Sequence, residues 1–115
     1  MPTVKLMISK KLDRNEKEDL ALRLTSLVAE ALGKPESVTQ ALVLDDAVIS
    51  FGGNFLAPSA FLEVMSIGGL SPKVCRHLSS VLCGLFADYG VSAQRVYINF
   101  NEKRACDWGW NSDTF

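Results

Sequence analysis

The chain has 115 residues, the usual size of one domain and too short for two ordinary hydrophobic cores, so residues 1–115 are expected to form a single domain. Twelve basic and thirteen acidic side chains are mixed along the sequence. This balance argues against a large basic surface for nucleic acid or an anionic membrane. Hydrophobic residues come in short runs interrupted by charges, and no run approaches the roughly 20 apolar residues of a membrane helix.

The first residues lack the basic start and long apolar stretch of a signal peptide, so we expect a soluble, cytoplasmic protein, with secretion by a nonclassical route left open. Proline at position 2 favours removal of Met1. The cysteines are odd in number and lack CxxC spacing, which indicates neither a disulfide scaffold nor a zinc site. We interpret them as reduced thiols: Cys75, Cys83 and Cys106.

The first half of the chain is predicted to fold as strand, helix, strand, over residues 3–8, 14–32 and 38–44. Asp13 can cap the helix while Glu16, three residues on, reaches back to form a capping box. The last strand carries apolar residues on both faces. One apolar stripe follows the helix: Leu20, Leu24, Leu27, Val28 and Ala31.

The second half repeats this plan, with strands at residues 61–67 and 95–100 and a helix between them. Ser71 is expected to cap that helix with Pro72 at its first position, and Gly90 to end it. The repeat predicts two duplicated β-α-β halves in an α+β fold. The second helix also carries an apolar stripe: Val74, Leu78, Val81, Leu82 and Leu85.

Two amphipathic helices can cover only one face of a four-stranded mixed sheet, although the strands around residues 42–44 and 64–67 are apolar on both faces. No further helix is predicted to cover the second face. We therefore expect copies of the chain to close into a symmetric ring with their sheets facing inward. The Trp108-Gly109-Trp110 segment follows the last strand and is expected to dock on a neighbouring copy.

Most common catalytic sites find no support in the sequence. The single histidine, His77, lies in a polar stretch of the second helix and is best interpreted as a solvated residue, so no metal site is predicted. The pairs Gly52-Gly53 and Gly68-Gly69 lack the spacing of a phosphate or dinucleotide loop, so no cofactor is predicted. No GxSxG surrounds a serine, which argues against a hydrolase.

The start of the chain offers one unusual reagent. Removal of Met1 would expose the secondary amine of Pro2 at the end of a buried strand. Apolar surroundings and a nearby cation such as Lys34 both disfavour a protonated amine, so they lower its pKa from about 8. A neutral amine held by the proline ring suits abstraction of a proton from carbon beside a carbonyl. Pro2 by itself, however, indicates only easy removal of Met1.

The sequence resembles the macrophage migration inhibitory factor and D-dopachrome tautomerase family along nearly its whole length. Seven short segments match the family and occur in the same order along the chain. The resemblance rests on this shared order and on the distribution of the segments over the whole sequence. These segments are Pro2, Gly33-Lys34-Pro35, Ser50-Phe51-Gly52-Gly53, Ser66-Ile67-Gly68, Leu82-Cys83-Gly84, Arg95-Val96-Tyr97-Ile98-Asn99-Phe100 and Gly109-Trp110-Asn111.

The resemblance implies a homotrimeric tautomerase that acts without a cofactor, with Pro2 as its base. Lys34 matches the lysine that holds a substrate carboxylate or carbonyl oxygen, and Ile67 matches the residue whose backbone amide binds the substrate's polar end. Tyr97 and Asn99 match groups that the adjacent subunit contributes, so dissociation would abolish activity. Without the resemblance, Lys34 reads as a solvated helix-end cation, and Tyr97 and Asn99 as ordinary interface residues.

The chain also departs from the family's vertebrate members. Their mid-chain CxxC, linked to thiol-disulfide activity, falls on residues 57–61 here, which contain no cysteine. Val38 stands where the vertebrate members have an aromatic residue that lines their pocket, and Trp108 stands where they have a small residue. We expect Trp108 and Phe115 to restore apolar contact with the ring of an aryl pyruvate such as phenylpyruvate, with dopachrome-like compounds as further candidates.

Two other interpretations remain open. One is a cytokine-like signalling or interaction protein whose trimer binds a receptor and whose amine pocket is vestigial. The other is a purely structural trimer that retains Met1. Retention would turn the Pro2 nitrogen into an amide without a basic lone pair.

Overall fold

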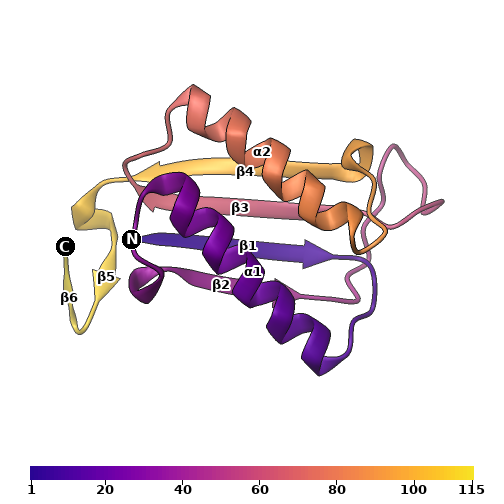
Figure 1. The fold of residues 1–115 in the computed structure, drawn as a ribbon, viewed down its shortest axis with the longest axis horizontal. Helices are drawn as coiled ribbons and strands as arrows, with labels where there is room; N and C mark the ends of the chain where they lie inside the picture. The colour runs from indigo at the N-terminus through magenta and orange to yellow at the C-terminus, as the bar shows by residue number, and fades with distance from the viewer.

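The computed structural model describes residues 1–115, and a four-stranded sheet lies at its centre with two helices on one face (Figure 1). The sheet has the order β2-β1-β3-β4. β1 pairs in parallel with β2, β3 in parallel with β4, and the central strands β1 and β3 are antiparallel. The predicted α+β class, the mixed sheet and the placement of both helices are confirmed. The strands are β1 (Pro2–Ile8), β2 (Gln40–Leu44), β3 (Ala60–Ile67) and β4 (Val96–Lys103).

The helices begin where their capping residues predict. α1 spans Arg14–Leu32, and Asp13 Oδ1 accepts a hydrogen bond from the Glu16 amide at 2.8 Å while Glu16 Oε1 accepts one from the Asp13 amide at 3.1 Å. α2 spans Pro72–Ala87, and Ser71 Oγ accepts a hydrogen bond from the Val74 amide at 3.3 Å. These bonds satisfy amides that a helix leaves without partners at its N-terminus.

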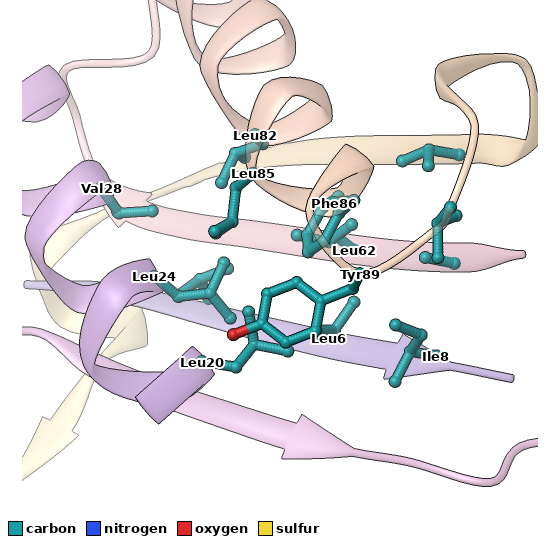
Figure 2. Packing of buried hydrophobic residues seen from close by; sticks show 14 of the residues in the cluster. Leu6, Ile8, Leu20, Leu24, Val28, Leu62, Leu82, Leu85, Phe86 and Tyr89 are labelled. Carbon is teal, nitrogen blue, oxygen red and sulfur yellow. The ribbon is translucent and has the colours of Figure 1, made fainter. Parts of the chain in front are cut away.

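The hydrophobic core fills the space between the helices and the covered face of the sheet (Figure 2). Alternate residues of β1 and β3 point into it, as a strand period of two requires. Both predicted stripes contribute, although their outer members, such as Leu27 and Val81, are only partly buried. Phe86 was not predicted, yet it is fully buried. The core side chains that pack between the sheet and the helices include Leu6, Ile8, Leu62, Leu20, Leu24, Val28, Leu82, Leu85 and Phe86.

Several predicted boundaries were wrong. β1 and β3 each start one residue earlier than predicted, at Pro2 and Ala60, and β4 continues to Lys103 rather than ending at residue 100. β2 starts at Gln40 rather than at residue 38, because Pro35 leads into a short 3-10 helix, η1 (Glu36–Val38). The second helix ends at Ala87, and Gly90 lies in the turn beyond it with a φ of 77°. Strand β4 begins one residue later than predicted because Arg95 ends another 3-10 helix, η2 (Ala93–Arg95).

The second face of the sheet has no cover within the chain. Leu44 of β2 is 44% exposed and Tyr97 of β4 is 67% exposed on this face. Neither helix is both long and apolar enough to cross a membrane. The chain therefore leaves part of its apolar strand surface in contact with water, as the sequence predicted.

The C-terminal segment forms a small hairpin beside the start of the chain (Figure 1). It consists of a 3-10 helix η3 (Ala105–Asp107) and the strands β5 (Gly109–Trp110) and β6 (Asp113–Thr114). Trp108 lines hollows of its own chain, together with Thr3 and Met65, whereas Trp110 stays 64% exposed. β4 returns the chain to the end of the sheet where β1 begins, which places Trp108 beside these residues of its own chain. Docking of the segment on a neighbouring copy stays a prediction.

Candidate functional site

The pairing of β1 with β3 brings the start of the chain next to Lys34. Pro2 is buried at the beginning of β1 and pairs with Ser66 of β3. Lys34 follows the end of α1, and its Nζ donates a hydrogen bond of 2.7 Å to the carbonyl oxygen of Ile67. Three predicted site residues, Pro2, Lys34 and Ile67, therefore gather at one end of the sheet.

The lysine influences the amine at the chain start. Partial burial and the adjacent positive charge of Lys34 together hold the pKa of the Met1 amine below its ordinary value of 8.0, burial being the larger cause. Both effects disfavour the protonated amine. An amine at this place is therefore more often neutral near pH 7 than an exposed terminal amine, and only the neutral form can accept a proton.

A cavity of about 390 Å³ opens beside the amine. Its size is within the range of small-molecule sites. Residues from three parts of the chain line it: Met1 and Thr3 from the start, the segment Ser37, Val38, Thr39 and Gln40 before and within β2, and Trp108, Gly109 and Trp110 from the hairpin. The indole of Trp108 thus lines the same cavity as Met1, whereas Pro2, Lys34 and Ile67 are not among the lining residues.

Trp110 lines this cavity as well, although the sequence did not predict it as a site residue. Trp108 and Trp110 are separated by one residue, and both line it. The i, i+2 spacing of the two tryptophans could have predicted this, but only Trp108 was predicted to contact the substrate. Phe115 does not line the cavity; its ring stacks on Trp110 with a centroid distance of 5.8 Å, and its amide donates to the Trp108 carbonyl at 3.2 Å.

Tyr97 and Asn99 lie far from Pro2 within one chain. Tyr97 pairs with Phe61, five positions along β3 from the Ser66 that pairs with Pro2, which corresponds to about 17 Å in the strand direction. Both side chains are exposed, whereas their neighbours Ile98 and Phe100 pack against the core. A single chain does not bring these residues into one site with Pro2.

Other candidate groups offer less chemistry. His77 is exposed on α2, as predicted, and no three His, Cys, Asp or Glu side chains are grouped to hold a metal ion. All three cysteines are unpaired. Burial raises the pKa of the Cys75 and Cys83 thiols, with Glu102 adding to the effect at Cys75, so their nucleophilic thiolate forms are disfavoured.

Comparison with known proteins identifies the relatives of this chain. A family model described as "Macrophage migration inhibitory factor (MIF)" matches residues 1–115. The macrophage migration inhibitory factor of Meriones unguiculatus is 37% identical over 99 residues, which cover 85% of each chain. The chain belongs to the macrophage migration inhibitory factor family. This family includes proteins with tautomerase and with cytokine-like roles.

Solved structures of family members have the same fold. The macrophage migration inhibitory factor homologue from Prochlorococcus marinus superposes with a TM-score of 0.91 at 32% identity, over 98% of both chains. The macrophage migration inhibitory factor-like protein of Entamoeba histolytica gives a TM-score of 0.93 at 30% identity, over 99% of this chain and 98% of the other. The chain thus shares its fold with proteins from distant organisms.

Proposed function

We propose that this protein is a keto-enol tautomerase of aryl pyruvates such as phenylpyruvate, working as a single-domain chain with the amine of Pro2 as its base once Met1 is removed. The observation that carries the proposal is the chain-start amine beside Lys34, at the edge of a partly apolar cavity. In the proposed reaction the neutral amine accepts the enol hydroxyl proton and returns a proton to the adjacent carbon, giving the ketone.

The positions of the side chains support the proposed roles. Trimming would place the new amine at the strand position paired with Ser66, next to the Ile67 carbonyl that holds Lys34. The Lys34 ammonium can pair with the substrate's carboxylate or carbonyl oxygen, and the Ile67 amide can donate to the same polar end. Trp108 would contact the aryl ring directly, while Phe115 would act by supporting Trp110.

A homotrimer completes the proposed site. The uncovered sheet face, with Leu44 and Tyr97 exposed, supports association of copies through that face. Tyr97 and Asn99 lie too far from Pro2 to act on the same substrate within one chain. We therefore propose that each site combines Pro2, Lys34 and Ile67 of one subunit with Tyr97 and Asn99 of the next.

Tautomerisation of phenylpyruvate, followed by ultraviolet absorbance, tests this function. The protein should be prepared in two forms whose intact masses show Met1 removed or retained. We expect the trimmed form to accelerate the reaction well above buffer, and the untrimmed form to be inactive because its Pro2 nitrogen is an amide. No acceleration by a trimmed trimer would reject the tautomerase and favour an interaction protein.

Trp108→Ala is expected to weaken substrate binding. Loss of the indole removes apolar contact with the aryl ring, and the expected result is a KM raised by about threefold to tenfold with a smaller change in kcat. Phe55→Ala is a suitable control because Phe55 is 68% exposed and lines a different cavity, near Tyr89. An unchanged KM in Trp108→Ala would show that this residue does not contact the substrate.

A further inference from the structure

We propose that Phe51 and Arg95 are positioning residues that hold the Tyr97 ring for use in the neighbouring subunit's site. This inference rests on the proposed function, because it concerns a residue that the shared site would receive from an adjacent chain. The residues that hold the Tyr97 ring belong to the same subunit as Tyr97.

A tight turn first sets the place of Phe51. The Phe51 amide donates to the Asn54 carbonyl at 3.0 Å, and the Asn54 amide donates to the Phe51 carbonyl at 3.2 Å. Gly52 and Gly53 between them have φ values of 60° and 76°. Two successive residues with positive φ are typical of a type I′ turn, which side chains with a Cβ rarely tolerate. The two reciprocal hydrogen bonds therefore close a tight turn with Phe51 at its first position.

Arg95 then joins this turn to the start of β4. Its Nε donates to Ser59 Oγ at 3.0 Å, one terminal nitrogen donates to Asn54 Oδ1 at 3.0 Å, and the other donates to the Asn54 carbonyl at 3.3 Å. Ser59 is fully buried. The planar guanidinium uses several donors at once, an arrangement that a lysine cannot reproduce. Arg95 thus holds the turn against the end of the sheet.

The Phe51 ring contacts both Arg95 and Tyr97. The guanidinium carbon of Arg95 lies 5.5 Å from the centre of the Phe51 ring, and the Tyr97 ring centre lies 4.9 Å from it at an interplanar angle of 42°. These distances are typical of cation–π and aromatic pairs. Tyr97 is otherwise 67% exposed, so the Phe51 ring restrains a side chain that has much of its surface in water.

A ring held in advance loses less conformational entropy when a substrate binds. A freely rotating Tyr97 would lose that entropy at each binding event, and the effect would appear in KM. Asn99 lies two positions further along β4, and the aromatic contact with Phe51 is made by Tyr97. The turn therefore acts on Tyr97 in particular.

Substitution of Phe51 tests the proposal on trimmed protein. Phe51→Ala should lower kcat/KM by about threefold to tenfold, mainly through KM, and Phe51→Leu should behave alike because it lacks the ring. Phe51→Tyr should restore the activity, whereas Arg95→Lys should cause a smaller loss. Phe55→Ala, in the same loop, should leave kcat/KM unchanged. Full activity in both Phe51→Ala and Phe51→Leu would overturn the proposal.

Mixed trimers show in which subunit Phe51 acts. Chains carrying Pro2→Gly and chains carrying Phe51→Ala are co-expressed with different tags, and trimers containing both are isolated. One of the three sites in each such ring then combines an intact Pro2 with an intact Phe51 turn from the adjacent chain. The mixture should be several times more active than the separate trimers combined. No gain would mean that Phe51 acts within its own subunit's site, which contradicts the proposal.

A crystal structure of Phe51→Ala gives a readout that does not depend on activity. We expect the Tyr97 side chain to be disordered or to adopt another rotamer, with β4 unchanged. A Tyr97 ring in its original place would overturn the positioning role. If the wild-type protein proves inactive, this result still decides whether Phe51 holds Tyr97, so failure of the tautomerase proposal is distinguishable from failure of this one.

Discussion

Pro2→Gly, in protein that has lost Met1, is expected to reduce phenylpyruvate tautomerisation by about a hundredfold or more, the scale of general base catalysis. Glycine still permits removal of Met1 and still supplies an amine. That amine is primary, however, and the glycine backbone is free to rotate, so its lone pair is no longer held toward the substrate. The measurement is kcat/KM by ultraviolet absorbance.

The control for this variant is its assembly. Intact mass should show that Met1 is absent, and the mass in solution and the melting temperature should match those of the wild type. Under these conditions a loss of rate reports on the base rather than on the fold. Wild-type activity in Pro2→Gly would exclude the proline ring as the source of catalysis.

Lys34→Gln is expected to have the second large effect, on both the rate and its pH dependence. The rate should rise with pH as the amine loses its proton, and the midpoint should lie below that of an exposed prolyl amine, because burial and the charge of Lys34 lower the pKa of an amine at this place, as they do for Met1. Removing the charge leaves only the effect of burial, so the midpoint should move upward. Loss of the ammonium should also reduce kcat/KM by about tenfold to a hundredfold at pH 7.

Lys10→Gln is the matched control for this experiment. Lys10 Nζ also donates to a backbone carbonyl, that of Tyr89 at 3.1 Å, but it lies near the opposite end of the sheet from Pro2. This variant loses one ammonium and one hydrogen bond without changing the field at the chain start. A midpoint that moves equally in both variants, or in neither, would contradict a specific role of Lys34.

Local parts of the fold could be predicted because they depend on neighbouring residues. Asp13 and Glu16 are three residues apart and form the capping box that their types predict. The repeated strand-helix-strand pattern predicted the two β-α-β halves of a mixed sheet, and in the structure β1 pairs in parallel with β2 and β3 with β4. The exposure of Leu44 and Tyr97 could also be expected, because two helices can cover only one face of a four-stranded sheet.

Other features depended on contacts between distant segments. The short helix that delays β2 to Gln40 is not visible in the apolar pattern, because Val38 continues that pattern in both conformations. The C-terminal hairpin turns at Asn111 and Ser112, both with positive φ, and this turn leads the Phe115 ring back onto Trp110. Neither residue is a glycine, so the turn carried no strong signal in the sequence.

The sequence by itself determined the helices, the strands and the family, because caps, periodicity and short ordered motifs are local properties of the chain. Only the tertiary structure decided that Lys34 reaches the Ile67 carbonyl beside Pro2, that both tryptophans line the cavity there, and that Phe51 meets Tyr97. These residues are separated by dozens of positions. Their meeting depends on strand register and on side-chain packing, which a single sequence does not encode locally.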